Sequence, residues 1–236
     1  MNLILVTKED FIAEKQVKLT DHRLTHILKV HRAEVGQSLK VGEVNGLMGY
    51  GKIIGLSKQA VVMDLILETQ PPKSVDLTLV IALPRPPTVK KILQGAIEMG
   101  VKKIHFIGAK RVEKSFWQSS LMTPEGLHKQ NLLGLEQAVD TILPTIQFHK
   151  YFKPFVSEVL PELLETSRGF IAHPKMDSPC PHQINEPVTV VIGPEGGFIP
   201  YEVEMLLETG LIPVHLGELI LRVEHATFSL ISKLTD

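Results

Sequence analysis

The chain has 236 residues, which is enough for two domains, and its 25 basic residues almost balance its 26 acidic ones. This balance excludes a strong positive field over the whole molecule, although a local basic surface for nucleic acid is compatible with it. The single cysteine, Cys180, excludes a disulfide framework, and no apolar run is long enough to span a membrane, so a cytoplasmic protein is expected.

Residues 1–70 are expected to form a small β-barrel or sandwich that carries one helix. The predicted strands are apolar or alternate apolar with polar residues, and they span Leu3–Val6, Ser38–Val41, Tyr50–Leu56 and Ala60–Leu67. Asn45-Gly46 is a strong turn signal between two of these strands. A helix is expected from about Asp21 to Val30, with Thr20 as its N-cap residue.

The segment Thr69–Ser74 contains two prolines among polar residues and is the best domain boundary in the chain. From residue 75 to residue 236, strands alternate with helices, which predicts a mostly parallel sheet with helices on both faces. Strands are expected at Leu77–Leu83, Lys103–Ile107, Thr145–Phe148, Gly169–Ala172, Val188–Ile192 and Pro213–Leu216. Helices are expected at Val89–Met99, Pro124–Val139 and Phe155–Leu164, after Pro200 and from about Glu224.

The strongest functional signal is the glycine-rich loop Gly193–Gly197, which follows the apolar strand Val188–Ile192 and precedes a helix. Ligands of parallel sheets bind at the carboxyl ends of the strands, where such loops lie. Glycine lets the backbone approach a ligand closely, and three glycines in five residues are more than a turn needs. Ligand binding is therefore favoured over a plain strand-to-helix turn.

A second glycine-containing loop, Leu216–Glu224, complements the first and leads into the last helix. The backbones of the two loops could hold an adenine or a ribose between them. Arg222 could meet a phosphate or a developing negative charge, and Glu224 could orient it or accept a proton. The alternative is a structural pair of Arg222 and Glu224 that caps the last helix.

The segment Gly46–Ile53 comes within one residue of the phosphate-binding pattern of nucleotide hydrolases. Ile53 stands where that pattern requires a hydroxyl group to hold magnesium. A strand also follows Lys52, where a helix should begin. A glycine-rich hairpin is therefore predicted here, and nucleotide hydrolysis is disfavoured.

His22 and His26 share one helical face with the basic residues Arg23, Lys29 and Arg32. Two histidines make an incomplete zinc site, so a metal centre is not predicted. A face of this kind could contact RNA phosphates. Simple solvation of the same side chains is an equally good interpretation.

The segments Ile192–Gly197 and Leu216–Glu224 together resemble the cofactor loops of the SPOUT methyltransferases. More specifically, the chain resembles the family of ribosomal RNA small-subunit methyltransferase E, which methylates N3 of a uridine in 16S rRNA. The resemblance extends over nearly the whole chain. Further family-like segments are His26–Arg32 with Gly36-Gln37, Ala96–Val101, Arg111, Glu136-Gln137 and His173-Pro174.

The resemblance implies an α/β fold in which residues 75–236 form a SPOUT methyltransferase domain, with a trefoil knot on a mostly parallel sheet. It implies that residues 1–70 form a PUA-like RNA-binding β-barrel. The protein would be a homodimer that binds S-adenosyl-L-methionine in the knot, needs no metal, and acts on 16S rRNA or the small ribosomal subunit. The alternatives are a non-catalytic RNA-binding paralogue and a SPOUT methyltransferase that acts on a different RNA position.

The resemblance also implies a set of site residues, of which Arg222 and Glu224 are the expected catalytic pair. The expected cofactor-binding residues are His173, Ile192, Gly193, Pro194, Glu195, Gly196, Gly197, Leu216, Gly217, Leu219, Ile220 and Leu221. The expected RNA-binding residues are Arg23, His26, Arg32, Arg85 and Arg111.

The chain departs from the family pattern at several positions. In the last loop, Leu219 replaces an arginine and His225 replaces a threonine. Asp140 stands where the family has an arginine, and lysines are replaced by Thr88 and Gly95. The first cofactor loop is intact, whereas positions that are expected to face RNA are altered, so the sequence supports cofactor binding better than it supports the exact RNA target.

Overall fold

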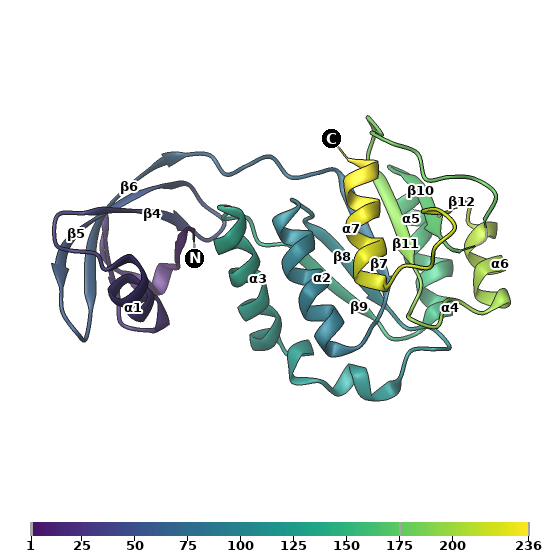
Figure 1. Ribbon diagram of the computed structural model, residues 1–236, viewed down its shortest axis with the longest axis horizontal. Coiled ribbons are helices and arrows are strands. Elements are labelled where there is room, and N and C mark those ends of the chain that lie inside the picture. The colour runs from purple at the N-terminus through teal and green to yellow at the C-terminus, as the bar shows by residue number, and fades with distance from the viewer. Residues whose placement is uncertain (1, 175, 236) are drawn as a thin grey trace. The chain divides into compact units, whose positions relative to one another are not determined.

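The computed structural model describes residues 2–174 and 176–235 (Figure 1). The chain forms two compact units. The first comprises Met1–Lys73 together with Leu132–Leu143, and the second comprises Ser74–Asn131 together with Pro144–Asp236. Each unit is therefore assembled from two separate segments of the polypeptide.

The first unit contains a six-stranded sheet with the strand order β1-β4-β5-β6-β3-β2. Its strands are β1 (Ile4–Val6), β2 (Phe11–Ala13), β3 (Gln16–Leu19), β4 (Ser38–Glu43), β5 (Met48–Leu56) and β6 (Val61–Thr69). β1 runs parallel to β4, and the other neighbouring pairs are antiparallel. Alternate residues such as Val17, Ile53 and Met63 are fully buried in the core of this unit.

The four strands expected in residues 1–70 are confirmed, but β2 and β3 are absent from the prediction. These strands have three and four residues, too few to show a clear alternation of polar and apolar side chains. The expected glycine-rich hairpin is confirmed, because β4 pairs with β5 around Asn45, which has a left-handed φ of 60°. The segment that imitates a phosphate-binding loop is thus a sheet strand.

The helix expected from Asp21 starts at His22 and has two parts, α1 (His22–His26) and a π-helix (Ile27–His31). The Asp21 carboxylate accepts a hydrogen bond from the Arg23 backbone N–H at 2.9 Å. Asp21 is therefore the N-cap residue, and the prediction of Thr20 is wrong. Aspartate and threonine both cap helices well, so the sequence alone favours neither strongly.

The second unit contains a six-stranded sheet in the order β12-β10-β11-β7-β8-β9, in which all neighbouring pairs are parallel. Its strands are β7 (Leu77–Ala82), β8 (Lys103–Ile107), β9 (Thr145–His149), β10 (Arg168–Ala172), β11 (Val188–Ile192) and β12 (Ile212–Val214). The central strands β7 and β11 are buried along their whole length, as their nearly continuous apolar sequences predict. The expected mostly parallel sheet is confirmed.

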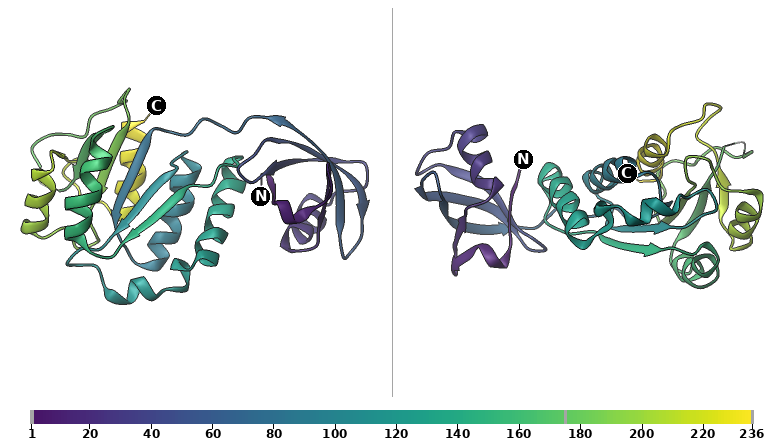
Figure 2. Two further views of the ribbon diagram at one scale, coloured as in Figure 1. Left: turned by 180° about the vertical axis from the view of Figure 1, so that it is seen from behind. Right: turned by 90° about the horizontal axis from the view of Figure 1, so that it is seen from below.

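Helices cover both faces of this sheet, with α2 and α7 on one face and α5 and α6 on the other (Figure 2). The helices of this unit are α2 (Pro86–Glu98), α4 (Phe152–Pro154), α5 (Leu160–Leu164), α6 (Pro200–Glu208) and α7 (Val223–Leu234). The helix α3 (Pro124–Ala138) begins in this unit and ends in the segment that belongs to the first. Leu79 and Ile81 of β7 face the first layer, whereas Val80 and Ala82 face the second. The helix expected at Phe155–Leu164 is present, but its first part is a π-helix (Phe155–Val159).

Candidate active site

A cavity of about 640 Å³ lies at the carboxyl ends of the strands of the parallel sheet. Ala172, Ile192 and Val214, which end β10, β11 and β12, line it together with Arg85 of the loop that follows β7. Its volume is within the usual range of small-molecule sites, roughly 300–1,000 Å³. Parallel sheets bind ligands at this edge, so this cavity is the candidate active site.

The first glycine loop is held by its own backbone and by the loop after β7. The Gly197 N–H donates a hydrogen bond to the Pro194 carbonyl at 2.7 Å, and Gly197 has the left-handed φ of 72° that favours glycine. The Glu195 carboxylate accepts a hydrogen bond from the Arg85 backbone N–H at 3.1 Å. Glu195 therefore joins two cavity walls that are far apart in the sequence.

Gly196 is supported from outside the loop by Arg111. The Arg111 guanidinium donates a hydrogen bond to the Gly196 carbonyl. A Cβ atom at position 196 would lie 3.0 Å from the Arg111 Cδ atom, which is tighter than ordinary packing. Gly196 does not line the cavity. The absence of a side chain at this position instead leaves room for the Arg111 side chain.

The second glycine loop exposes a run of apolar side chains. Gly217 has a left-handed φ of 116° and open space where a Cβ would lie. Leu219 and Ile220 are 84% and 80% exposed, and Leu221 is also exposed. Three consecutive exposed apolar residues on one loop are unusual unless a ligand or a partner covers them.

Arg222 and Glu224 both line the cavity but lie in opposite environments. Arg222 is exposed and makes no side-chain hydrogen bond or ion pair with any residue that the structure describes. Glu224 is buried, and its carboxylate lies 3.3 Å from the Lys91 ammonium nitrogen. A hydrogen bond from its own backbone N–H, aided by Lys91, lowers the pKa of Glu224. The structural Arg222–Glu224 pair, which was the alternative interpretation of the sequence, is therefore not formed, and Glu224 pairs with Lys91.

Two histidines line the cavity with one ring nitrogen each already engaged. His215 Nδ1 accepts a hydrogen bond from the Gly217 N–H at 3.0 Å. His173 Nδ1 lies 2.6 Å from the Pro174 carbonyl oxygen, which can only accept, so this nitrogen carries the proton. In the neutral rings, Nε2 is therefore a donor in His215 and an acceptor in His173.

The structure brings together nearly all the residues that the sequence analysis assigns to cofactor binding and catalysis. Those that line the cavity are His173, Ile192, Gly193, Pro194, Glu195, Gly197, Leu216, Gly217, Leu219, Ile220, Leu221, Arg222 and Glu224. Gly196 is the exception. Their roles toward a cofactor stay predictions.

The cavity also has lining residues that the sequence analysis does not assign to the site. They are Thr88, Lys91, Ala172, Pro174, Val214, His215, Val223 and Ala226. Several follow directly from strand ends, which a topology-based prediction could have included. Thr88 and Lys91 lie on α2 at a spacing of one helical turn. The sequence analysis names Thr88 only as a departure from the family pattern, and no sequence motif marks Lys91.

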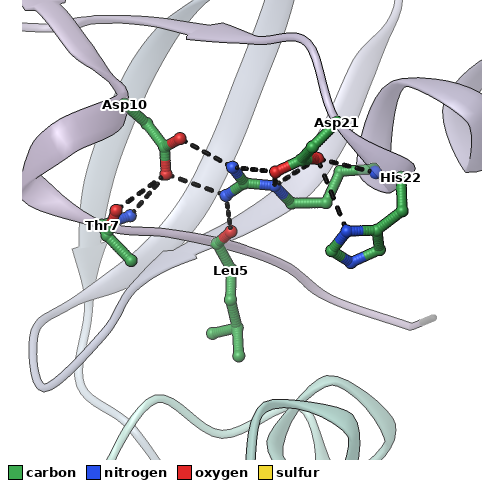
Figure 3. A network of polar contacts seen from close by, with 6 residues as sticks. Leu5, Thr7, Asp10, Asp21 and His22 are labelled. Atoms are coloured by element: carbon green, nitrogen blue, oxygen red, sulfur yellow. Dashed lines mark hydrogen bonds and ion pairs between the residues drawn. The ribbon is translucent and has the colours of Figure 1, made fainter. Parts of the chain in front are cut away.

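Arg23, an expected RNA-binding residue, is engaged within the first unit by Leu5, Asp10 and Asp21, which are labelled in Figure 3. Its guanidinium contacts the Asp10 carboxylate at 2.6 Å, the Asp21 carboxylate at 2.7 Å and the Leu5 carbonyl at 2.7 Å. Only 12% of its side chain is exposed. The structure therefore uses Arg23 to tie the helix start to the sheet, which leaves it poorly available for RNA.

The other expected RNA-binding residues lie in different environments. Arg32 is exposed just after the π-helix, and the His26 ring is half-buried, 5.0 Å from the His31 ring. Arg85 lines the cavity, and Arg111 supports the first glycine loop. Of this set, Arg32 and Arg85 have exposed side chains that make no hydrogen bond or ion pair with any residue that the structure describes.

Other chemistry finds little support in the described residues, 2–174 and 176–235. They contain no group of three or more His, Cys, Asp or Glu side chains that could hold a metal ion. Their helices lack the combined length and apolar character needed to cross a membrane. Cys180 is buried, and burial raises the pKa of its thiol, which disfavours a nucleophilic thiolate.

Comparison with known proteins shows a consistent set of relatives. A family model described as an RNA methyltransferase domain matches residues 71–235. Ribosomal RNA small subunit methyltransferase E of Treponema pallidum is 28% identical over 237 residues, which covers 96% of this chain and 87% of that protein.

Two solved structures share the fold over nearly the whole chain. A putative methyltransferase of Legionella pneumophila, in complex with the bound cofactor SAM, has a TM-score of 0.75 and 22% identity. Ribosomal RNA small subunit methyltransferase E of Neisseria gonorrhoeae, bound to S-adenosyl methionine, has a TM-score of 0.72 and 19% identity. Each match covers 98% of this chain and 95% of the other.

Proposed function

Because this chain belongs to the RNA methyltransferase family, we propose that it transfers the methyl group of S-adenosyl-L-methionine to N3 of a uridine in 16S ribosomal RNA. The observation that carries the proposal is the cavity in which two glycine loops meet beside exposed Arg222 and buried Glu224. The Treponema pallidum relative, which bears the name of a ribosomal RNA methyltransferase, supports the class of substrate.

The cavity residues fit S-adenosylmethionine. Gly197 and Gly217 have left-handed φ values and open space where a Cβ would lie, so a ligand can approach the backbone of both loops. Ile192, Leu216 and Leu221 offer apolar surface suited to an adenine ring. When bound there, S-adenosylmethionine supplies an electrophilic methyl group. The two solved relatives described above both contain it.

Arg222 is the residue that we assign to the charge of the reacting base. The N3 proton of uridine is weakly acidic, so methyl transfer at N3 requires stabilisation of the negative charge that forms on the ring. Arg222 lines the cavity and is exposed, so the donors of its guanidinium are available to a ligand there. A donor placed at a developing anion is worth roughly 3–4 kcal/mol of barrier.

Glu224 is better suited to orientation than to proton transfer. Its lowered pKa keeps the carboxylate ionised and makes it a weak proton acceptor near neutral pH. Since it is buried and paired with Lys91, its position is fixed. We assign it to holding the base, or Arg222, by hydrogen bonding.

The family architecture is part of the proposal. We assign residues 75–236 to a SPOUT domain with a trefoil knot, and residues 1–70 to a PUA-like RNA-binding barrel. The six-stranded, largely antiparallel sheet of the first unit supports the second assignment. For RNA contact we retain Arg32, His26 and Arg85 and leave out Arg23.

We also propose that the protein is a homodimer. The exposed apolar residues Leu219, Ile220 and Leu221 are compatible with coverage by a second copy of the chain. Light scattering coupled to size-exclusion chromatography measures the mass directly. A monomer at micromolar concentration would contradict this part of the proposal.

One experiment tests the function. The protein is incubated with labelled S-adenosylmethionine and small ribosomal subunits that lack their own modification at the target, and the product is mapped by mass spectrometry. Label at N3 of one uridine in 16S rRNA is the expected result. Label elsewhere would show a methyltransferase with a different target, and RNA binding without label would show a non-catalytic RNA-binding protein.

The non-catalytic alternative rests on positions where the chain departs from the family, and the structure weakens one of them. Asp140, which stands in place of an arginine, is buried, and its carboxylate accepts a hydrogen bond from the Ile142 N–H at 3.0 Å. It therefore presents no negative charge to RNA. Leu219 and His225 are exposed and keep the alternative open to test.

A further inference from the structure

Lys91 is a cavity residue that the proposed function names only as the ion-pair partner of Glu224. It lies on α2 and lines the cavity, and its ammonium nitrogen is 3.3 Å from the Glu224 carboxylate. The Lys91 side chain is 61% exposed, whereas that of Glu224 is 9% exposed. The pair therefore joins a solvated cation on one helix to a buried anion at the start of another.

The packing of α2 against α7 explains why these two side chains meet. One helical turn after Lys91 is Gly95, and one turn after Glu224 is Phe228. A Cβ atom at position 95 would lie 2.5 Å from the Phe228 ring, so the absence of a side chain at Gly95 lets the two helices approach closely. Lys91 and Glu224 face each other at the equivalent positions one turn earlier.

Stability does not account for this pair. An exposed lysine gains little free energy from an ion pair, because water competes for both charges. The effect on the carboxylate is larger, since a buried carboxylate with few partners needs a donor to hold one orientation. Lys91 is the side-chain donor that reaches Glu224 among the described residues.

We propose that Lys91 is a positioning residue of the methyl-transfer site, which acts by holding the Glu224 carboxylate in one orientation beside Arg222. This inference rests on the proposed function. It deepens that function by making α2, and not only the two glycine loops, part of the reacting centre. A carboxylate held in this way presents its remaining lone pairs to the base without a rearrangement during the reaction.

The test compares two substitutions of Lys91 in two backgrounds. Lys91→Met removes the charge and keeps the length, and Lys91→Arg keeps the charge. Lys91→Met is expected to lower kcat about three- to tenfold, with less than about a twofold change in KM for the small subunit. Lys91→Arg is expected to retain most of the wild-type kcat. Lys90→Met, an exposed neighbour on the same helix, is the matched control.

The Glu224→Gln background shows whether Lys91 acts through Glu224. In that background, Lys91→Met is expected to lower kcat no further, because the group that it positions is already neutral. An equal loss in both backgrounds, or no rescue by Lys91→Arg, would overturn the inference. The unfolding midpoints of the Lys91 variants are expected to be unchanged, which would show that a lower kcat does not come from a loss of folded protein.

A measurement without substrate completes the test. The carboxyl carbon of Glu224 is titrated by NMR, and in Lys91→Met its pKa is expected to rise, since Lys91 on α2 and His225 on α7 are the charged groups that lower it. An unchanged pKa overturns the inference. A wild-type protein that transfers no methyl group would refute the proposed function itself, whereas an active wild type with an equally active Lys91→Met variant refutes only the role of Lys91.

Discussion

The arginines of this chain fall into two groups: those whose donors are available to a ligand, and those whose donors are engaged in contacts within the chain. Arg222 has an exposed guanidinium that no described residue engages, whereas Arg111 and Arg23 donate their hydrogen bonds within the chain. The same residue type thus has its donors available at one position, where we propose a catalytic role, and engaged in structural contacts at two others. Availability of the donors, and not the presence of arginine, distinguishes them.

Replacement of Arg222 tests the first group. Arg222→Ala is expected to lower kcat roughly 100- to 1,000-fold, because the anion of the base loses a donor in the transition state. The Kd for S-adenosylmethionine, measured by calorimetry, is expected to change less than about twofold. Arg168→Ala, at the opposite end of β10, is the control. Full activity in Arg222→Ala would refute the assignment.

The residue scale also shows what sequence could and could not predict of the site. The two glycine loops were predictable, because glycines and a carboxylate after an apolar strand leave a clear pattern. Lys91 was not, since a lysine on a helix surface is usually solvated and its partner Glu224 is over one hundred positions away in the chain. Gly196 lies within the predicted loop, but the sequence does not indicate that the Arg111 side chain packs beside it, because the two residues are far apart in the chain.

Pairs of elements set the geometry of the second unit, and α2 and α7 are the clearest case. Gly95→Leu is expected to destabilise the protein by roughly 1–3 kcal/mol, because the new side chain must occupy the space of the Phe228 ring. It should also lower kcat by separating Lys91 from Glu224. Urea denaturation and the methyl-transfer assay measure the two effects.

A compensating change checks the cause. Phe228→Ala in the Gly95→Leu background opens the space again, so the double variant should be less destabilised than the sum of the two single variants. Additive losses would show that the Phe228 ring is not the obstacle.

β8 and β9 carry a pair of histidines, buried His105 and half-buried His149, that no proposed step uses. His105 Nδ1 lies 3.1 Å from His149 Nε2, and the Phe155 ring packs against both rings. Burial, then the proximity of His149 and Lys103, lowers the pKa of His105 to about 4. His105 is therefore neutral in the folded protein at neutral pH.

This lowered pKa predicts a loss of stability in acid. Below its ordinary pKa, near 6.5, His105 binds a proton in the unfolded chain but not in the fold, so its contribution is complete above about pH 6.5 and is lost as the pH falls toward 4. His105→Gln is expected to reduce the stability lost between pH 7.5 and pH 4.5 by roughly 1–3 kcal/mol in urea denaturation. Exposed His128→Gln should leave that loss unchanged.

The helices and strands were the most predictable features of this fold. The strands β7, β8 and β11 and the helices between them follow from long apolar patterns, because burial on both faces selects such sequences. The π-helices Ile27–His31 and Phe155–Val159 were not predictable, since one extra residue in a turn leaves the apolar periodicity nearly intact. Short edge strands such as β2 were missed because their three or four residues carry no clear pattern. They are extended because they pair with a neighbouring strand, as β2 pairs with β3.

At the scale of the whole molecule, the first unit depends on a segment that lies far along the chain. The Glu136 carbonyl accepts hydrogen bonds from the N–H groups of Asn2 and Leu3, both at 3.1 Å. The Thr141 hydroxyl donates to the Gly46 carbonyl at 2.6 Å. The prolines near residue 71 predict a boundary between two consecutive domains. They do not indicate that residues 132–143 belong to the first unit.

The side chain of Glu136 offers a measurement of this dependence. It is buried, and burial raises its pKa to about 7, so the fold retains a proton that the unfolded chain releases near pH 4.5. Its stabilising contribution is therefore complete below about pH 4.5 and is lost as the pH rises toward 7. Glu136→Gln is expected to stabilise the protein by roughly 1–3 kcal/mol at pH 8 and to change little at pH 4.5.

Denaturation at the two pH values measures this effect, with exposed Glu125→Gln as the control on the same helix. Equal stabilisation at both pH values would show that lost packing or hydrogen bonding, and not the charge of Glu136, is responsible.

The return of residues 132–143 to the first unit also fixes an order of events during translation. Lys73 leaves the ribosome about 70 residues before Leu143, an interval of roughly 4–14 s at ordinary elongation rates. Until then, the N–H groups of Asn2 and Leu3 lack the Glu136 carbonyl that accepts their hydrogen bonds. The part of the protein that is synthesised first is thus completed only after more than half of the polypeptide has been made, and its nascent form is exposed to chaperones and proteases in the meantime.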